Sequence, residues 1–235
     1  MRTAVLVPGA WLGGWVWARL SPHLPNWHLV TPTLSGLTPD AGAADDVDLA
    51  QHVADVVEVC RTHKVRDAVL VGHSYAGLVI GGAVPQLVDC VSHVVYLDAA
   101  LPTAGRSLVS DWSASGRAAV RAEAAAQGDP TRWPVPDDLG AMSVMSDFSA
   151  ADHAWFQAHA QPHPIETLYQ PVAKVAHPTH VVPHTYVVCT RDRPTVPEAV
   201  ERLRRDAAWH VVELDTGHWP MITAPRPLAD VLRAL

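Results

Sequence analysis

The sequence predicts an α/β fold, with a doubly wound, mostly parallel six-stranded sheet and an inserted helical cap. Short β-branched runs alternate with longer amphipathic segments, which is typical of parallel strands joined by right-handed helical crossovers. The alternation is interrupted once, over a long central segment. With 235 residues, 49% of them hydrophobic, the chain has enough apolar side chains for one substantial core.

The strands and helices of the sheet are expected in alternating order. The segments with strand composition are 3–7, 28–32, 67–71, 93–97, 185–189 and 210–214. The segments with helical patterning are 14–21, 47–63, 75–84, 197–206 and 225–235. Helices between successive parallel strands would cover both faces of the sheet.

The interruption is expected to be a cap inserted into the core. The core comprises residues 1–100 and 184–235, and the insertion comprises residues 101–183. The insertion is rich in Ala, Pro, Trp, Ser and His, with helical patterning at 115–127 and 150–159 and no convincing strand. Because so long a loop without structure of its own is uncommon, a helical subdomain over one end of the sheet is favoured.

The charge pattern argues against nucleic acid and membrane partners. The formal net charge is −7 and the only lysines are Lys64 and Lys174, so no basic stripe is available to neutralise phosphates. No segment approaches the roughly 18 apolar residues of a membrane span, and the first apolar run is too short for a signal peptide. Three cysteines, Cys60, Cys90 and Cys189, lack metal-type spacing, which suits a reducing compartment. We therefore expect a cytoplasmic protein.

Polar residues with complementary chemistry follow three of the expected strands. Ser74 follows the third strand, Asp192 the fifth and His218 the sixth. Reactive groups of an open parallel sheet gather at the carboxyl ends of its strands. A serine hydroxyl needs an imidazole to take its proton, and the imidazole needs a carboxylate to fix its tautomer. The order Ser, Asp, His is the one expected for a nucleophile elbow.

The turn around the serine has the small residues that such an elbow requires. Gly72 and Ala76 lie two residues before and two after Ser74, where larger side chains would collide with neighbouring backbone. The backbone N–H of Tyr75 would point toward a developing oxyanion. The second donor is expected from the loop after the first strand, as the N–H of Ala10.

Four motifs give the chain its resemblance to a known family. They are VLVPGAWLGGWVW, LVGHSYAGLVI, YVVCTRDRPTVPEAVERLR and VELDTGHWPMITAPRPLADVL. The chain resembles the α/β-hydrolase superfamily over nearly its whole length, most of all the salicylate-binding-protein, methylesterase and hydroxynitrile-lyase group. The resemblance implies the triad Ser74, Asp192 and His218.

The chain departs from the pattern of this group at four positions. Pro8 stands where the group usually has a histidine that braces the oxyanion loop, and Ala76 replaces the last glycine of the elbow. The lyases use a threonine where this chain has Gly9 and a lysine where it has Trp219. Without that lysine no cation would hold a departing cyanide, so the resemblance implies ester hydrolysis.

The acid of the triad has an alternative. Asp98 also follows a strand, in VVYLDAALP, and some relatives of the fold draw the acid from that strand. Asp98 would otherwise cap the first turn of the insertion. Asp215 is expected to order its loop, and His73 is expected to pack beside the nucleophile without transferring a proton.

No metal or other cofactor is expected, although the chain has 14 histidines. Prolines interrupt both histidine clusters, and no cysteine or acidic ligand completes a site. These clusters are His153, His159 and His163, and His177, His180 and His184. Candidate substrate-binding residues are Trp11, Trp133, Phe148 and Trp219.

The sequence therefore predicts a serine esterase that cleaves a small carboxylic ester through an acyl-enzyme. The family resemblance favours an aromatic or methyl ester as the small-molecule partner. Two alternatives stay open: hydrolysis of a carbon–carbon bond or processing of a polyketide-like intermediate on the same triad, and ligand binding with little turnover. The oligomeric state stays open too, with a homodimer as one option.

Overall fold

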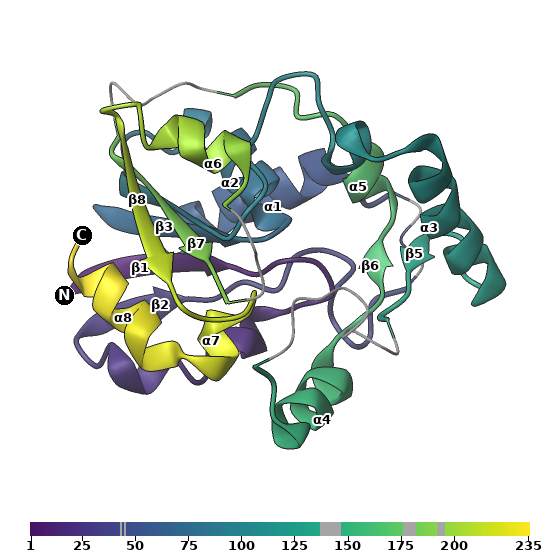
Figure 1. The fold of residues 1–235 in the computed structure, drawn as a ribbon, viewed down its shortest axis with the longest axis horizontal. Helices are drawn as coiled ribbons and strands as arrows, with labels where there is room; N and C mark the ends of the chain where they lie inside the picture. Colours follow the sequence, from purple (N-terminus) through teal and green to yellow (C-terminus); the bar gives the residue numbers. More distant parts are fainter. Residues whose placement is uncertain (43, 45, 137–146, 176–181, 192–195) are drawn as a thin grey trace.

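Six parallel strands form the central sheet in the order β2-β1-β3-β4-β7-β8 (Figure 1). The computed structural model describes residues 1–42, 44, 46–136, 147–175, 182–191 and 196–235. The strands are β1 (Arg2–Val7), β2 (Trp27–Val30), β3 (Ala68–His73), β4 (Val91–Leu97), β7 (His184–Cys189) and β8 (Trp209–Leu214). All six strands predicted from β-branched composition are confirmed, with bounds shifted by two residues or fewer.

Helices cover both faces of the sheet, as predicted. Figure 1 shows α1, α2 and α6 on one face, and α8 with the 3-10 turns η1 and η2 on the other. Their bounds are α1 (Leu49–Thr62), α2 (Ala76–Ala83), α6 (Glu198–Leu203), α8 (Pro225–Arg233), η1 (Gly14–Trp17) and η2 (Ser21–His23), with α7 (Pro220–Thr223) before α8 and η3 (Val84–Gln86) after α2.

The helix expected over 14–21 is two short 3-10 turns instead. Pro22 lies at the start of the second turn, where its missing N–H costs nothing, but it cannot donate within a longer helix. The tighter turns still bury Val16 and Trp17 against the sheet.

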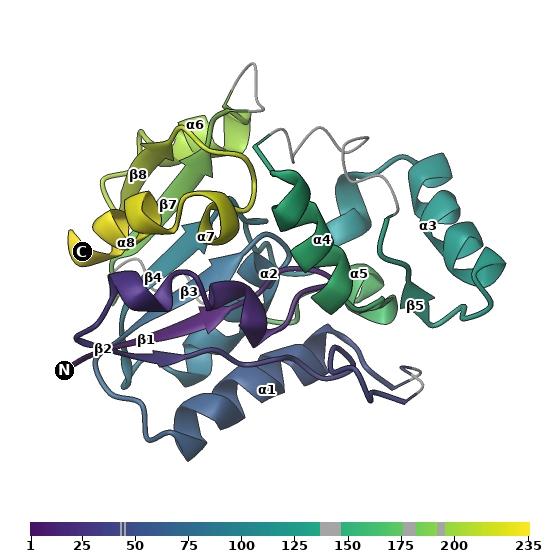
Figure 2. The same cartoon turned by 90° about the horizontal axis from the view of Figure 1, so that it is seen from below.

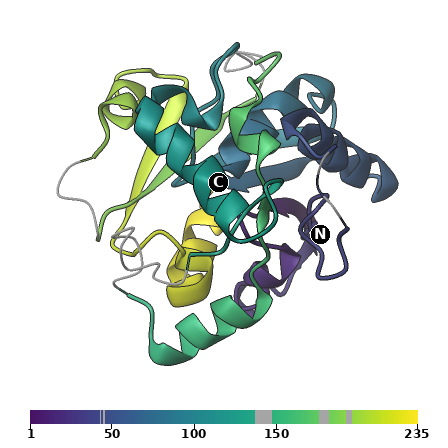
Figure 3. The same cartoon turned by 90° about the vertical axis from the view of Figure 1, so that its right-hand side faces the viewer.

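The chain between β4 and β7 lies beyond the carboxyl ends of the strands (Figure 2). Figure 3 looks onto it, with α3 across the centre and α4 at the lower edge. Its elements are η4 (Leu108–Asp111), α3 (Ala114–Ala126), β5 (Arg132–Trp133), α4 (Ala150–His159), β6 (His163–Pro164) and α5 (Glu166–Tyr169). The two helices predicted here are present. The antiparallel β5–β6 ladder was not predicted, because two-residue strands carry no hydrophobic period.

Helix α2 packs in the middle of the core. It runs directly from the turn after β3, and all of its residues except Gly82 are buried. A Cβ on Gly77 would lie 2.1 Å from the carbonyl oxygen of Ala100, so the helix and the segment after β4 touch backbone to backbone. This contact fixes α2 against the end of β4.

Within the described residues, no helix is long and apolar enough to cross a bilayer.

The close contact at Gly77 predicts a stability effect opposite to helix propensity. Alanine is about 1 kcal/mol better than glycine in a helix, yet Gly77→Ala should lower the free energy of unfolding by about 2 kcal/mol, because the new methyl overlaps the Ala100 carbonyl. Urea unfolding measures the change. Gly42→Ala, where a Cβ would meet no atom within 4 Å, should change it by less than about 0.5 kcal/mol. Equal free energies of unfolding for Gly77→Ala and Gly42→Ala would contradict the close contact between Gly77 and the Ala100 carbonyl.

Candidate active site

Ser74 lies on a strained turn between β3 and α2. Its φ is 55°, in the left-handed region that side chains other than glycine seldom adopt. Its N–H donates to the carbonyl of Leu97 at 3.1 Å, and its own carbonyl accepts from Gly77 N–H at 3.1 Å and Ala100 N–H at 3.0 Å. These bonds hold the turn in a conformation that the isolated chain would avoid.

Close packing explains why the residues around Ser74 are small. A Cβ on Gly72 would lie 2.8 Å from the carbonyl oxygen of Ala76, closer than real contacts allow. Ala76 itself is fully buried, so it leaves no room for a larger side chain. Gly77, which was not singled out from the sequence, is restricted more severely, by its contact with the Ala100 carbonyl.

Backbone strain concentrates around a single cavity. Among the described residues, five other than glycine have a positive φ, and three of these, Trp11, Ser74 and Asp98, line this cavity. Strained residues persist where the surrounding structure holds them, and they are common at functional sites.

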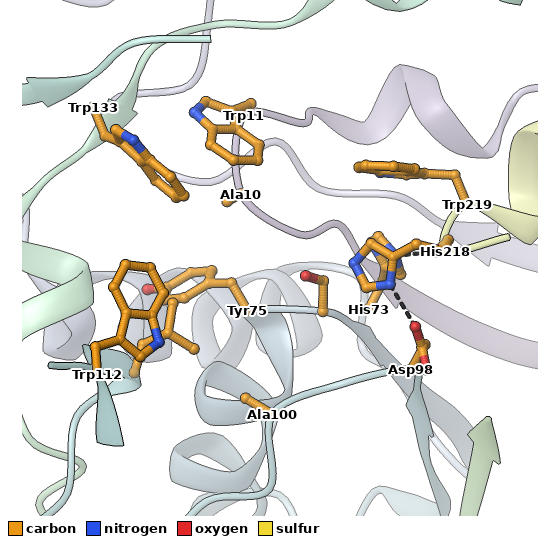
Figure 4. Close-up of a pocket in the computed structure, with 12 residues that line it drawn as sticks. Ala10, Trp11, His73, Tyr75, Asp98, Ala100, Trp112, Trp133, His218 and Trp219 are labelled. Atoms are coloured by element: carbon orange, nitrogen blue, oxygen red, sulfur yellow. Dashed lines mark hydrogen bonds and ion pairs between the residues drawn. The ribbon is translucent and has the colours of Figure 1, made fainter. Parts of the chain in front are cut away.

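The cavity has a volume of about 280 Å³ and is walled by aromatic rings (Figure 4). Figure 4 shows Trp11, Trp112 and Trp133 around one end, and His218 with Asp98 at the other. The described lining residues are Ala10, Trp11, His73, Ser74, Tyr75, Asp98, Ala100, Leu108, Trp112, Trp133, His218 and Trp219.

His218 pairs with the carboxylate of Asp98. The distance between His218 Nδ1 and Asp98 Oδ2 is 2.5 Å, and the Asp98 side chain is fully buried. The other carboxylate oxygen accepts from the N–H of Cys189 at 3.3 Å. A carboxylate on Nδ1 fixes the imidazole as the Nδ1–H tautomer and leaves Nε2 to accept a proton.

The acid expected from the sequence, Asp192, stays a prediction. Asp192 lies outside the described residues. Among the described residues, the carboxylate on His218 Nδ1 is that of Asp98, the alternative, which directly follows β4.

His73 supports the backbone of His218. Its Nε2–H donates to the His218 carbonyl at 2.8 Å, and the two rings lie 4.7 Å apart. Burial, with a smaller effect from the nearby His218, lowers the pKa of His73 to about 3. His73 is therefore neutral, and its ring packs beside the nucleophile as expected.

Asp147, in the insertion, holds the loop that carries His218. Its Oδ2 accepts from Gly217 N–H at 2.7 Å and from the Thr223 hydroxyl at 2.8 Å. The side chain is only 4% exposed. No sequence pattern marked this contact, because Asp147 is 70 residues away along the chain from the N–H that it accepts.

The two N–H groups expected to bind an oxyanion belong to residues that line the cavity. Ala10 and Tyr75 come from the loop after β1 and from the turn after Ser74. Neither N–H donates to another described residue. The Tyr75 hydroxyl is 3.0 Å from Nδ1 of His52, and Nε2 of His52 is 2.9 Å from the carbonyl of Ser35. Because a carbonyl only accepts, His52 donates from Nε2 and accepts the Tyr75 proton at Nδ1.

Three of the four aromatic residues expected to bind substrate line the cavity: Trp11, Trp133 and Trp219. The rings of Trp11 and Trp133 are 4.1 Å apart. Phe148 is not among the lining residues, and its ring packs 5.5 Å from that of Trp219. Besides the aromatic residues, Leu108 and Ala100 line the cavity, and no sequence signal marked them.

No group of three metal-ligand side chains occurs in the described part of the chain. His177 and His180 lie outside the described residues. His163 uses both ring nitrogens for hydrogen bonds, to Trp11 and to Thr167.

A family model described as the alpha/beta hydrolase family matches residues 4–231. The chain belongs to this family. Curated relatives of this chain include a carbendazim hydrolyzing esterase from Nocardioides sp. (strain SG-4G), 28% identical over 247 residues that cover 100% of both chains. Polyneuridine aldehyde esterase from Rauvolfia serpentina is 32% identical over 111 residues, covering 44% of this chain and 41% of that protein.

The hydrolase also shares its fold with a solved extracellular alpha/beta-hydrolase from a Paenibacillus species. That extracellular protein shares structural and functional homology with tobacco salicylic acid binding protein 2. The TM-score is 0.85 at 21% identity, over 100% of this chain and 98% of the other. The family and fold predicted from the sequence motifs are therefore confirmed.

The buried neutral His73 predicts a loss of stability in acid. Below pH 6.5 the unfolded chain binds a proton that folded His73 does not accept until about pH 3, so the free energy of unfolding falls as the pH is lowered. The contribution is about 1.4 kcal/mol per pH unit. Urea unfolding at pH 6.5, 5.5 and 4.5 measures how the free energy of unfolding changes with pH. For His73→Gln, which keeps an N–H donor, this free energy should fall less steeply with decreasing pH than for the wild type, by about 1.4 kcal/mol per pH unit. An unchanged slope would contradict a neutral His73.

Proposed function

We propose that this hydrolase cleaves small, neutral carboxylic esters through an acyl-enzyme on Ser74. The observation that carries the proposal is that the strained serine shares one cavity with the hydrogen-bonded pair of His218 and Asp98. A base with a fixed tautomer beside a partly exposed serine is the arrangement that activates a hydroxyl nucleophile.

The reaction proceeds in two balanced halves. Ser74 Oγ attacks the ester carbonyl carbon while Nε2 of His218 takes its proton, and the alkoxide then leaves with that proton as the alcohol. Water attacks the acyl-enzyme in the second half, His218 again takes and returns a proton, and the carboxylic acid leaves as Ser74 is restored. In both halves the N–H groups of Ala10 and Tyr75 stabilise the oxyanion.

Asp98 is the proposed acid of the triad. Its buried carboxylate orients His218 through Nδ1 and stabilises the imidazolium that forms during attack. The bond from Cys189 N–H to its second oxygen leaves Oδ2 directed at the imidazole.

The cavity favours a neutral substrate with a flat apolar part. Its described walls are mostly indole rings and small apolar side chains, and they include no acidic or basic side chain other than Asp98, His73 and His218. About 280 Å³ lies near the lower limit of ordinary ligand sites, which suits a small molecule. The names of two relatives, carbendazim hydrolyzing esterase and polyneuridine aldehyde esterase, agree with ester chemistry.

A fluorophosphonate probe tests the nucleophile. The wild-type protein should take up one probe per chain and Ser74→Ala none, with hydrolysis of p-nitrophenyl acetate lowered at least about a thousandfold and the circular dichroism spectrum unchanged. Ser115→Ala, at an exposed site on α3, should label like the wild type. Folded wild-type protein that takes up no probe would contradict the enzyme and favour ligand binding without turnover.

Paired substitutions test the acid. Asp98→Asn should lower kcat about a thousandfold, because an amide that donates to Nδ1 selects the wrong tautomer of His218. Asp192→Asn should leave kcat within about threefold of the wild type. Rates with p-nitrophenyl acetate measure both, and the reverse ranking would return the role to Asp192.

A further inference from the structure

The insertion is hydrogen-bonded to the loop that carries Ala10, and both bonds are made to the backbone of Trp11. Trp11 N–H donates to Nδ1 of His163 at 3.3 Å, and the Trp11 carbonyl accepts from Gln161 N–H at 2.9 Å. The φ of Trp11 is 65°, a conformation that costs a bulky residue roughly 1 kcal/mol or more. Pro8, in the same loop, has no N–H with which to stabilise it. Within the loop, Leu12 N–H donates to the Gly9 carbonyl at 3.3 Å, and the bonds from the insertion add to it in offsetting this cost.

The hydrogen bonds of His163 fix which of its nitrogens carries the proton. The Thr167 hydroxyl lies 2.6 Å from the carbonyl of Pro164 and must donate to it. The hydroxyl oxygen therefore accepts from Nε2–H of His163, at 2.9 Å. Nδ1 is left with a lone pair, which is what the N–H of Trp11 requires.

His163 is also held neutral. Its side chain is fully buried, with the ring of Tyr75 4.8 Å away, and burial lowers its pKa well below the usual range. A protonated ring would direct an N–H at the N–H of Trp11. Burial therefore keeps Nδ1 of His163 an acceptor for the N–H of Trp11.

The element that carries His163 also carries a wall of the cavity. In the β5–β6 ladder His163 is paired with Trp133, whose ring contacts that of Trp11. Arg132, next to Trp133, donates to the carbonyl of Gly36 at 2.6 Å, which anchors the ladder to the core. The position of His163 is therefore set by its pairing in the ladder and by the anchor of that ladder on the core.

We propose that His163 is a positioning residue that aims the Ala10 N–H at the oxyanion by holding the next residue, Trp11. The inference rests on the proposed esterase function. It means that the oxyanion site is assembled jointly by the core and the insertion. Since the oxyanion exists only in the transition state, losing its alignment lowers kcat and leaves KM nearly unchanged.

Two substitutions at His163 distinguish the loss of its hydrogen-bond acceptor from a change in side-chain size. His163→Leu removes the acceptor at similar size, whereas Oδ1 of His163→Asn can take the place of Nδ1 and accept from Trp11 N–H. His159→Leu, at an exposed position of α4 where the ring contacts Trp15 and makes no hydrogen bond to Trp11, is the control for a histidine of the insertion. Each variant is compared with the wild type by kcat and KM for p-nitrophenyl acetate, and by Ki for phenylboronic acid, whose serine adduct mimics the tetrahedral intermediate.

We expect His163→Leu to lower kcat about 10- to 100-fold with KM within twofold, and to raise the Ki of the boronic acid in parallel. His163→Asn should recover most of kcat, and His159→Leu should match the wild type. If His163→Leu keeps kcat within threefold of the wild type, or if the Asn variant is as slow as the Leu variant, the inference is overturned. A wild type that neither hydrolyses ester nor takes up fluorophosphonate overturns the proposed function instead, and the inference with it.

A second measurement covers the case in which His163→Leu does not fold. Thr167→Val removes the hydroxyl that accepts from Nε2–H of His163, so the proton of His163 is no longer held on Nε2. Trp11 itself is unchanged. It should lower kcat about 3- to 10-fold, and the Trp11 amide should exchange with solvent at least about tenfold faster by NMR. Wild-type rates for both kcat and amide exchange would overturn the inference.

Discussion

The parallel pairing of β3 with β4 is the interaction on which the site depends. His73 lies opposite Leu97 in this register, so the residues that follow them, Ser74 and Asp98, leave the sheet side by side. The N–H of Ser74 bonds to the carbonyl of Leu97, and both departing residues have a positive φ. A register shift of one residue would reverse the faces of β3 and separate the serine from the carboxylate.

The sheet alone does not hold the loops in place. The insertion contributes a carboxylate, Asp147, to the loop of His218 and an imidazole, His163, to the loop of Ala10. Both side chains are almost fully buried and bond to backbone groups. The segment between β4 and β7 therefore does more than cover the cavity, because it contacts the two loops that must stay aligned with Ser74.

Much of this architecture was predictable, and the exceptions have physical causes. The strands were clear because each is a short β-branched run, and the elbow was clear because small residues flank Ser74. The choice between Asp98 and Asp192 was not, since both follow strands and composition does not show which carboxylate lies beside His218, where the described residues place Asp98. Contacts of the insertion escaped prediction because they join residues far apart in the chain to backbone atoms, which leave no side-chain pattern.

The apolar wall of the cavity has a consequence for the end of the catalytic cycle. In the proposed reaction an ester enters uncharged, and its hydrolysis leaves an acid that ionises at neutral pH. The described walls, with Trp112, Trp133 and Trp219, offer that anion no cationic side chain, and Asp98 is already negative. Holding an unpaired charge in such surroundings is costly, so the carboxylate is stabilised by leaving for water. In the proposed function, the same apolar walls would therefore hold the neutral ester and favour departure of the charged product.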